Sequence, residues 1–379
     1  MEKTRLTSAR DGLMTRLSQT LILPILLGLS LAANPALAGD RVVNVYNWSD
    51  YIGPNVLEDF TKETGIKVVY DTYDSNETLE TKLLAGNTGY DVVVPSGTFL
   101  ERQIKAGLYL KLDRSKLPHW NGLWPEVLER LAVHDPGNQY AADYMWFTTG
   151  IAYNADKARE RLGDRPIDTW DIFFKPELLK KFADCGVYVL DSPEDLFTIA
   201  LNYLKLDPNS KKLPDLHRAA NLLAAMRPNV KKFHSSEYIN ALANGDICLA
   251  VGWSGDTYQA RARAKEANNG VDIEYAIPKE GTLMSLDSIA IPKDAPHVDE
   301  AYAFIDFLLR PDIAARNTNT TNFANGVLAS KDLVSQDILN NKSIYPDPDT
   351  MKRLFTVTSY DQSVQKYVTR EWTRVKTGK

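Results

Sequence analysis

The sequence lacks the motifs on which most enzyme chemistry depends. It holds no HExxH or CxxC motif, no GxxxxGK[ST] phosphate loop and no GxGxxG after a predicted strand. Its five histidines are scattered along the chain; they are His119, His134, His217, His234 and His297. These absences argue against a metallohydrolase, a dithiol oxidoreductase or a nucleotide-binding enzyme. We expect no metal, no cofactor and no catalytic residue.

The chain is also short of positive charge. Its 379 residues include 44 Lys and Arg against 49 Asp and Glu, which gives a net charge of −5. Proteins that bind nucleic acid carry clustered basic charge. We therefore expect no nucleic-acid partner.

Long hydrophobic runs are scarce, and the one at residues 21–33 lies near the start of the chain. Four basic residues precede it, and the A-x-A spacing of Ala36 and Ala38 follows it, which is typical of a cleaved signal peptide. A membrane anchor is the alternative, but Pro24 and Gly28 interrupt the run, which is shorter than the ~20 residues that span a bilayer. We expect residues 1–38 to be a signal peptide and the exported chain to carry 40 basic and 47 acidic groups, a net charge of −7.

Cysteine is rare, since only Cys185 and Cys248 occur. Two cysteines without nearby histidines make a poor tetrahedral metal site. Export to an oxidising compartment favours one disulfide, and two buried free thiols remain the alternative.

The chain that follows Gly39 alternates apolar β-prone runs with amphipathic helical segments. Strands are predicted at 41–48, 66–73 and 90–96, and helices at 53–65 and 75–86. Asp74 and Glu77 have the spacing of a capping box at the second helix. Strands joined by helices specify a parallel sheet with helices on its faces, and ligands of such sheets lie beyond the carboxyl ends of the strands.

Two further β-prone stretches, 144–154 and 273–293, are long enough to cross from one lobe to another. We therefore expect an α/β chain of two lobes with discontinuous sequence, in which the C-terminal tail crosses once more. The expected first lobe comprises 39–148 and 278–335, and the second comprises 149–277 and 336–379.

Acids recur beside an aromatic or hydroxyl residue at strand ends and helix starts. Trp48-Ser49-Asp50 is one case, and the segment from Trp253 to Asp256 is another. Asp195 and Asp287 add two more carboxylates. Carboxylates near indole faces suit a cation with an aliphatic body. Core packing of the tryptophans, and a helix-dipole role for Asp195, are the alternatives.

With these residues assembled, the chain resembles the periplasmic polyamine-binding proteins of ABC importers, and within them the putrescine-binding branch. The motifs that carry the resemblance are colinear over the chain that follows the signal peptide; they are "YNWSDYI", "FTKETGIKVVYD", "DVVVPS", "FLERQ", "HSS-YIN-LANGDIC-A-GW-GD", "IPKEG" and "LLRPD". The resemblance implies a two-lobed, hinged periplasmic binding protein fold of type II, each lobe a mainly parallel sheet flanked by helices. It also implies a monomer that binds a small cationic polyamine in the periplasm and delivers it to an inner-membrane ABC permease.

The resemblance also assigns roles to individual residues. Those of the first lobe and the return crossing are Trp48, Ser49, Asp50, Ser96, Asp287 and Phe323, and those of the second lobe are Asp195, Ser235, Trp253 and Asp256. Trp48 would cover the alkyl chain of the ligand, while Ser49 and Asp50 would serve an amine. The resemblance further implies that Cys185 and Cys248 form a disulfide.

Three departures from the family pattern leave the ligand open. Ser285 stands where putrescine binders have an aromatic residue, Asp195 replaces a Glu, and Phe323 replaces a Tyr. The first two changes enlarge the pocket, so putrescine, spermidine, agmatine, a glutamylated polyamine and a basic amino acid derivative all remain candidates. A secreted hydrolase that uses Asp256 and Asp287 as a carboxylate pair is the alternative from another class.

Overall fold

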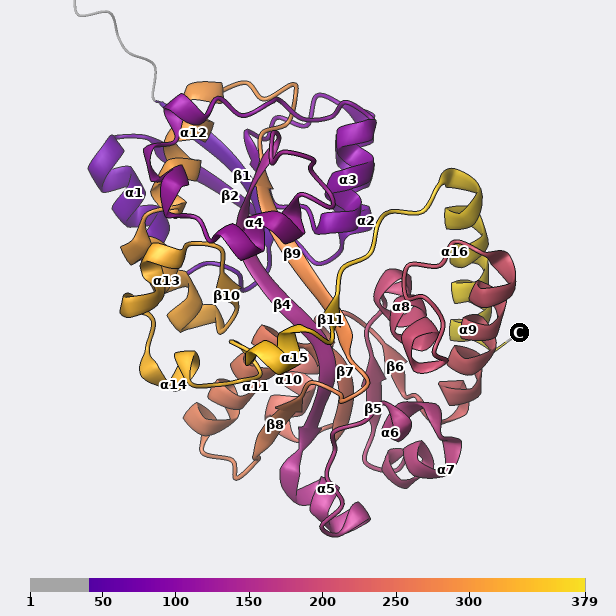
Figure 1. The fold of residues 1–379 in the computed structure, drawn as a ribbon. Helices are drawn as coiled ribbons and strands as arrows, with labels where there is room; N and C mark the ends of the chain where they lie inside the picture. Colours follow the sequence, from indigo (N-terminus) through magenta and orange to yellow (C-terminus); the bar gives the residue numbers. More distant parts are fainter. Residues whose placement is uncertain (1–40, 379) are drawn as a thin grey trace, which may run out of the picture. The chain divides into compact units, whose positions relative to one another are not determined.

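The computed structural model describes residues 41–378, so the signal peptide expected at 1–38 lies outside the described residues. The described chain is an α/β protein, as expected (Figure 1). Its strands are β1 (Val42–Trp48), β2 (Lys67–Tyr73), β3 (Val92–Val93), β4 (Ala141–Asn154), β5 (Val187–Val189), β6 (Lys232–Phe233), β7 (Leu249–Trp253), β8 (Ile273–Ala276), β9 (Thr282–Ala290), β10 (Ala324–Asn325) and β11 (Leu354–Phe355).

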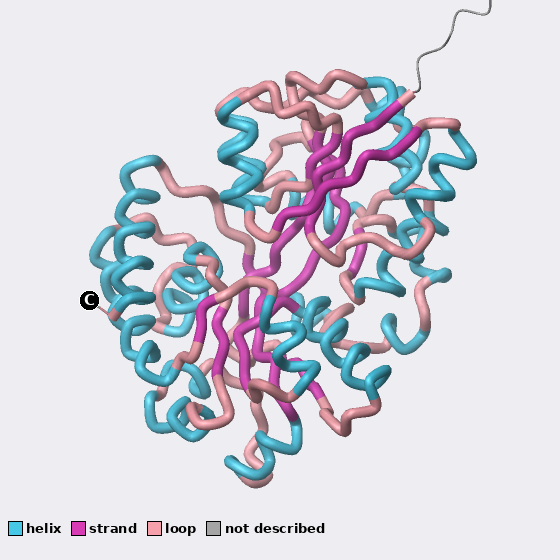
Figure 2. The backbone as a smooth tube through the Cα atoms, turned by 180° about the vertical axis from the view of Figure 1, so that it is seen from behind, coloured by secondary structure: helices cyan, strands magenta, loops and turns pink. Residues whose placement is uncertain are grey.

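Helices cover the strands from both faces (Figure 2). In chain order the α-helices are α1 (Val56–Thr64), α2 (Asn76–Ala85), α3 (Gly97–Lys105), α4 (Pro125–Leu131), α5 (Ala155–Leu162), α6 (Asp171–Phe174), α7 (Pro176–Leu179), α8 (Pro193–Tyr203), α9 (Leu213–Met226), α10 (Glu237–Asn244), α11 (Ser254–Ala267), α12 (Val298–Leu308), α13 (Pro311–Thr321), α14 (Gln336–Leu339), α15 (Pro348–Met351) and α16 (Gln362–Thr377). None of these helices is long and apolar enough to cross a bilayer.

The predicted alternation at the start of the chain is confirmed. β1 pairs in parallel with β2 and β3, and α1 and α2 connect them. Gly65 ends α1 at a φ of 69°, a conformation that glycine adopts without strain. The helix cap lies one residue later than the predicted capping box: Ser75 caps α2, and its hydroxyl accepts from the backbone N–H of Thr78.

Two long strands, β4 and β9, join the two halves of the sheet (Figure 1). They pair antiparallel over Ala141–Thr148 of β4, and the rest of β4 pairs with β7 and β8. The strand order is β2-β1-β3-β9-β4-β7-β5-β6. The sheet is therefore mixed, because parallel strands at each end meet the antiparallel crossing strands in the middle. The predicted second crossing divides into β8 and β9.

Three hydrophobic clusters form the core. The largest draws its buried residues from 151–273 and 360–375. The other two draw theirs from 43–147 and 284–354. Residues 336–354 thus pack with elements from the start of the chain, since Ile338 and Ile344 belong to one of these two clusters.

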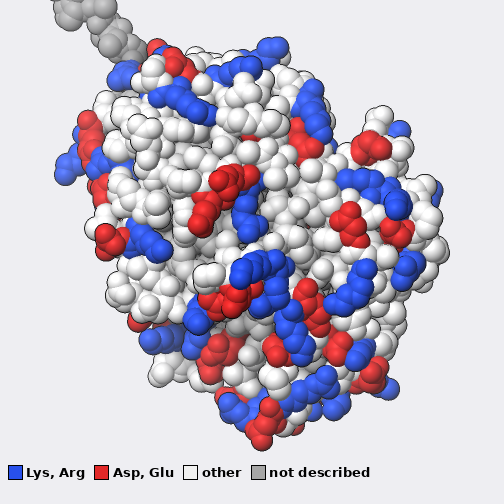
Figure 3. All heavy atoms as spheres, in the orientation of Figure 1, with Lys and Arg blue, Asp and Glu red and all other residues white. Residues whose placement is uncertain are grey.

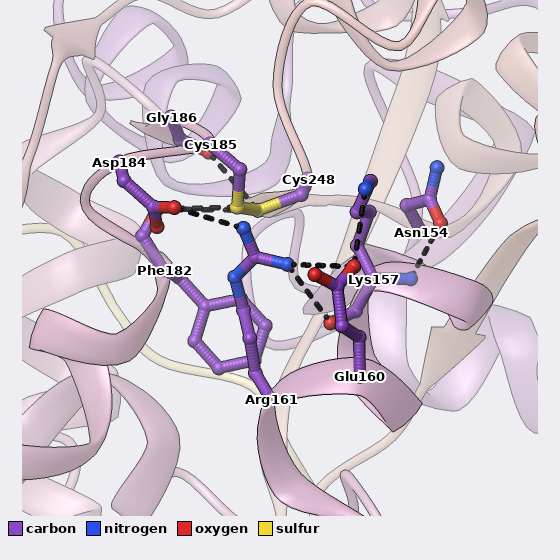
Figure 4. Close-up of a disulfide and its surroundings, with 9 residues drawn as sticks. All are labelled: Asn154, Lys157, Glu160, Arg161, Phe182, Asp184, Cys185, Gly186 and Cys248. Carbon is purple, nitrogen blue, oxygen red and sulfur yellow. Dashed lines mark hydrogen bonds and ion pairs between the residues drawn. A yellow bond between two sulfur atoms is a disulfide. The ribbon is translucent and has the colours of Figure 1, made fainter.

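The disulfide expected between Cys185 and Cys248 is present (Figure 4). The two Cα atoms are 5.7 Å apart, and the bridge joins the segments that lead into β5 and β7. These strands pair in parallel, so the bridge ties together neighbours in the sheet. Beside it, the Arg161 guanidinium lies 3.1 Å from the Asp184 carboxylate.

Candidate ligand-binding site

Two adjoining cavities lie at the carboxyl ends of β1 and β7, and together they are lined by every residue predicted for the site. Nine of these residues line one cavity; they are Trp48, Ser49, Asp50, Ser96, Ser235, Trp253, Asp256, Asp287 and Phe323. The remaining two, Asp195 and Ser285, line the second cavity, which shares Trp48 and Trp253 with the first.

Two indole rings pack edge-to-face beside the cavities. Trp48 ends β1 and Trp253 ends β7, and their ring centroids are 6.2 Å apart at an interplanar angle of 73°. The Trp48 indole N–H donates to the carbonyl of Val94 at 3.0 Å, which fixes the ring. Both side chains are half-buried and line both cavities, so they serve as walls as well as packing residues.

Asp287 projects from β9 into the first cavity. It is 3% exposed, and its Oδ1 accepts from the Ser96 hydroxyl at 2.6 Å. The β9 backbone meets Ser96 in an isolated antiparallel bridge, which brings the two side chains together. Burial raises the pKa of Asp287 to about 7 because the charged form loses its hydration.

Asp256 lies in the first turn of α11, on the other side of the same cavity. Its Oδ2 accepts from the Tyr238 hydroxyl at 2.8 Å. Burial raises the pKa of Asp256 to about 7, and the hydrogen bond from Tyr238 partly offsets this effect. The helix N-terminus is an electrostatically favourable place for a carboxylate.

Asp195 lies in the first turn of α8 and lines the second cavity. Its carboxylate accepts from the hydroxyls of Thr149 and Ser192 and, at 3.5 Å, from the Trp253 indole N–H. Burial raises its pKa as well.

Among the acids that line the two cavities, Asp195, Asp256 and Asp287 share one property. All three are at most 9% exposed, yet no Lys, Arg or His within residues 41–378 lies within 4 Å of any of their carboxylates. Buried carboxylates without a cation are costly. Around these cavities the acids provide the negative charge that a bound cation would neutralise.

Asp50 and Ser49 differ from these acids, because both lie at the rim. The Asp50 side chain is 53% exposed, and its carboxylate lies 3.1 Å from the guanidinium of Arg263 on α11. The Ser49 hydroxyl is directed to the carbonyl of Tyr73 at 3.4 Å. The predicted amine partner Asp50 therefore already has a cation.

Like the pair of Asp50 with Arg263, a second ion pair joins segments that belong to different hydrophobic clusters. Arg102 on α3 lies 2.8 Å from Glu194 at the start of α8, and 2.9 Å from Glu80 on α2. With Asp50 and Arg263, this pair connects the two sides of the cavities. The surface charge is otherwise interspersed, as one face shows (Figure 3).

Aromatic residues that the sequence analysis missed complete the walls. Phe147 on β4 lies 5.3 Å from Phe323 and 5.8 Å from Trp253, measured between ring centroids. Tyr51 packs edge-on against Phe323 at 4.8 Å, and its buried hydroxyl lies close enough to Asp287 to lower the pKa of that acid. Ser285 is the β9 partner of Phe147, so an aromatic residue there would lie beside Phe147.

Gly255 makes this packing possible. A Cβ atom at this position would lie 2.2 Å from the Phe323 ring. The glycine of the "WSGD" sequence is therefore required by the packing of Phe323. This reason is not visible in the local sequence, because Phe323 is distant along the chain.

The chain matches the model of the bacterial extracellular solute-binding proteins over residues 55–346. It belongs to this family. This chain is 52% identical to the putrescine-binding periplasmic protein PotF of Escherichia coli, over 90% of this chain and 93% of the relative. It is 51% identical to the putrescine-binding periplasmic protein SpuD of Pseudomonas aeruginosa, over 97% of this chain and all of the relative.

A solved structure described as a putative spermidine/putrescine ABC transporter from Listeria monocytogenes has the same fold. The TM-score is 0.79 at 32% sequence identity, and the match covers 89% of this chain and all of the other. The expected α/β periplasmic solute-binding protein fold is confirmed. Because the family is one of solute-binding proteins, the alternative of a hydrolase that uses Asp256 and Asp287 has no support.

Proposed function

We propose that this chain is the periplasmic solute-binding subunit of a polyamine ABC importer. It binds a putrescine- or spermidine-type cation in the cavities that Trp48 and Trp253 line. The observation that carries the proposal is the set of three buried carboxylates, Asp195, Asp256 and Asp287, none of which has a cationic partner in the described chain. The printed names of PotF and SpuD, which describe putrescine binding, support the same ligand class.

The geometry suits a linear cation with a positive charge at each end. One ammonium would lie between Asp256 and Asp287, which line the same cavity from α11 and β9. The other would reach Asp195 in the second cavity. Charge-assisted hydrogen bonds hold the ends, and the methylene groups lie against the indole faces of Trp48 and Trp253.

The protein would close around its ligand as two lobes, for which the sequence predicts 39–148 with 278–335 and 149–277 with 336–379. Support comes from the core clusters, one of which is built from 151–273 and 360–375. The packing of Ile338 with the other clusters favours a final crossing nearer Phe355 than the sequence indicated. The crossing strands β4 and β9 would form the hinge.

The ion pairs Asp50–Arg263 and Arg102–Glu194 would hold the closed form in place. The closed monomer would then dock on the inner-membrane permease, with no nucleic acid involved.

The length of the ligand is set by the second cavity. Ser285 is half-buried there and leaves open the side of Phe147 that an aromatic residue would cover. This space favours spermidine or agmatine over putrescine. Glutamylated polyamines and basic amino acid derivatives remain possible ligands of the same site.

Titration calorimetry of the chain without residues 1–38 tests the proposal. Putrescine, spermidine and agmatine are compared with 1,4-butanediol, which has the length of putrescine but no charge. We expect saturable binding of at least one amine and none of the diol. Equal binding of amine and diol, or binding of none, would contradict the proposal.

A further inference from the structure

A buried polar pair lies outside the ligand cavities. Asp143 on β4 and Ser288 on β9 are register partners, and both are 0% exposed. Neither oxygen of the Asp143 carboxyl has a hydrogen-bond partner in the described chain, and the Ser288 hydroxyl has none either. Opposite residues of an antiparallel pair project to the same side, so three unpartnered oxygens share one face of the crossing strands.

This face is the reverse of the one that holds the ligand cavities. Ser288 follows Asp287, and successive side chains of a strand point to opposite faces. Asp287 lines a cavity, whereas neither Asp143 nor Ser288 lines either of the two. The alternation instead places Ser288 on the side of Leu286 and Ala290, which belong to the core cluster under that face.

The chain leaves space for the Asp143 carboxyl. A Cβ atom at Gly326 would lie 2.3 Å from Asp143 Oδ2 and 2.8 Å from its Cβ. The β4–β9 register also shifts between Asp143 and Met145, which is a bulge that interrupts the ladder. The Asp143 carboxyl group is thus enclosed where the β4–β9 ladder is interrupted and the regular backbone pairing stops.

We propose that Asp143 and Ser288 form an internal water site, in which one or two waters bridge the carboxyl group and the hydroxyl. Buried waters make about three hydrogen bonds to groups that otherwise lack partners, which matches the three oxygens. A hard cation such as Ca²⁺ takes six or more oxygens, so the oxygen count favours water. The site is separate from the ligand cavities and does not depend on the proposed function.

Burial favours the neutral form of the carboxyl group at this site, since neither of its oxygens has a hydrogen-bond partner in the described chain. Burial raises the pKa of Asp143 well above its usual range, and Asp287, the charged group that acts on it, raises it further. A neutral Asp143 donates one hydrogen bond and accepts others. Together with the Ser288 hydroxyl, it supplies both donors and acceptors to the water.

A crystal structure of the chain without residues 1–38, grown in rubidium chloride, tests the site directly. We expect ordered water within hydrogen-bond distance of Asp143 and Ser288, without anomalous signal from rubidium. An empty site would overturn the proposal. Anomalous density there would also overturn it, because the site would then hold a cation.

Chemical denaturation of Asp143→Asn provides a second test. Because the neutral acid ionises only on unfolding, its stabilising effect is lost as the pH rises above the unfolded pKa of about 4. The unfolding constant of the wild type should rise relative to that of Asp143→Asn by up to tenfold per pH unit from pH 5 to 7. If the ratio of the two unfolding constants does not change with pH, Asp143 is charged in the folded protein. That result would overturn the proposal of a neutral acid bound to water.

Discussion

The Tyr238 hydroxyl donates a hydrogen bond of 2.8 Å to Asp256 and accepts one of 3.0 Å from the backbone N–H of Trp253. A single buried phenol thus positions one wall and one acid of the same cavity. Tyr238 lies on α10 and contacts Trp253 at the end of β7 and Asp256 at the start of α11, so it holds these two cavity residues in register.

Removal of this hydroxyl should weaken amine binding. In Tyr238→Phe, Asp256 loses its hydrogen-bond donor and its charged form becomes less favourable. We expect a loss of about 1–3 kcal/mol in binding free energy, measured by calorimetry. Tyr203→Phe is the matched control, since Tyr203 also donates to an aspartate, Asp171, but lines neither cavity. Equal effects of both variants would show that the Tyr238 hydroxyl has no special part in binding.

Amine affinity should depend on pH between 6 and 8. Burial raises the pKa of Asp256 and of Asp287 to about 7, so protons compete with the ligand below that pH. Alkyl ammonium groups keep their charge up to about pH 10. Affinity should therefore fall as the pH drops from 8 to 6, by up to tenfold per unit for each acid.

The same acids affect stability in the opposite direction. Since their folded pKa is raised, the stability of the ligand-free protein should fall as the pH rises from about 4 through 7.

For the affinity prediction, calorimetry in buffers of different ionisation enthalpy measures the protons released on binding. An affinity that stays constant from pH 6 to 8 would contradict the shifted pKa values of both acids.

The preference for ligand length should depend on Ser285. An aromatic ring at this position would lie beside Phe147 and fill part of the second cavity. A cation–π contact of about 0.5–2 kcal/mol would then favour a short diamine. We expect wild type to prefer spermidine or agmatine over putrescine, and Ser285→Phe to shift the preference toward putrescine.

Competition titrations of the three amines against both proteins measure this shift. Ser285→Ala, which keeps the space but removes the hydroxyl, is the control. Tight putrescine binding by wild type that Ser285→Phe leaves unchanged would show that the space is filled from elsewhere.

The disulfide should stabilise the protein without affecting binding. Cys185 and Cys248 are 63 residues apart in sequence, and neither lines a ligand cavity. A bridge that closes a loop of this length contributes about 2–5 kcal/mol. The double Cys→Ala variant should unfold at lower denaturant yet bind amines with the affinity of wild type. A loss of binding under conditions where the variant is folded would place the bridge in the function of the site.

Local patterns were enough to predict the elements at the start of the chain. Apolar runs of strand length and stops such as Gly65 act over a few residues, so β1, α1, β2 and α2 follow from sequence. The packing of Ile338 with the cluster that includes Trp146 could not be predicted, because nothing near Ile338 indicates which core it joins. Long-range packing decides such cases.

The site shows the same division. Trp48, Trp253, Asp195 and Asp256 could be predicted because they end strands or begin helices. Asp287 lies within β9, and its role came from the resemblance to the family. Phe147 could not, because it lies within a strand that is buried on both faces, and its direction depends on its pairing with Ser285. The pair of Asp50 with Arg263 joins residues far apart in sequence, and no local signal exists for it.

The most direct test of the account is the amine affinity of Asp256→Asn and Asp287→Asn, measured by calorimetry at pH 8. Loss of one charge-assisted hydrogen bond should weaken binding by about 1.5–3 kcal/mol in each variant, on the order of tenfold to a hundredfold. Asp337→Asn is the matched control, because Asp337 is exposed on α14 and lines neither cavity. We predict wild-type affinity for the control and weakened binding for both cavity variants. Wild-type affinity in all three folded proteins would contradict the assignment of the buried acids to the ligand.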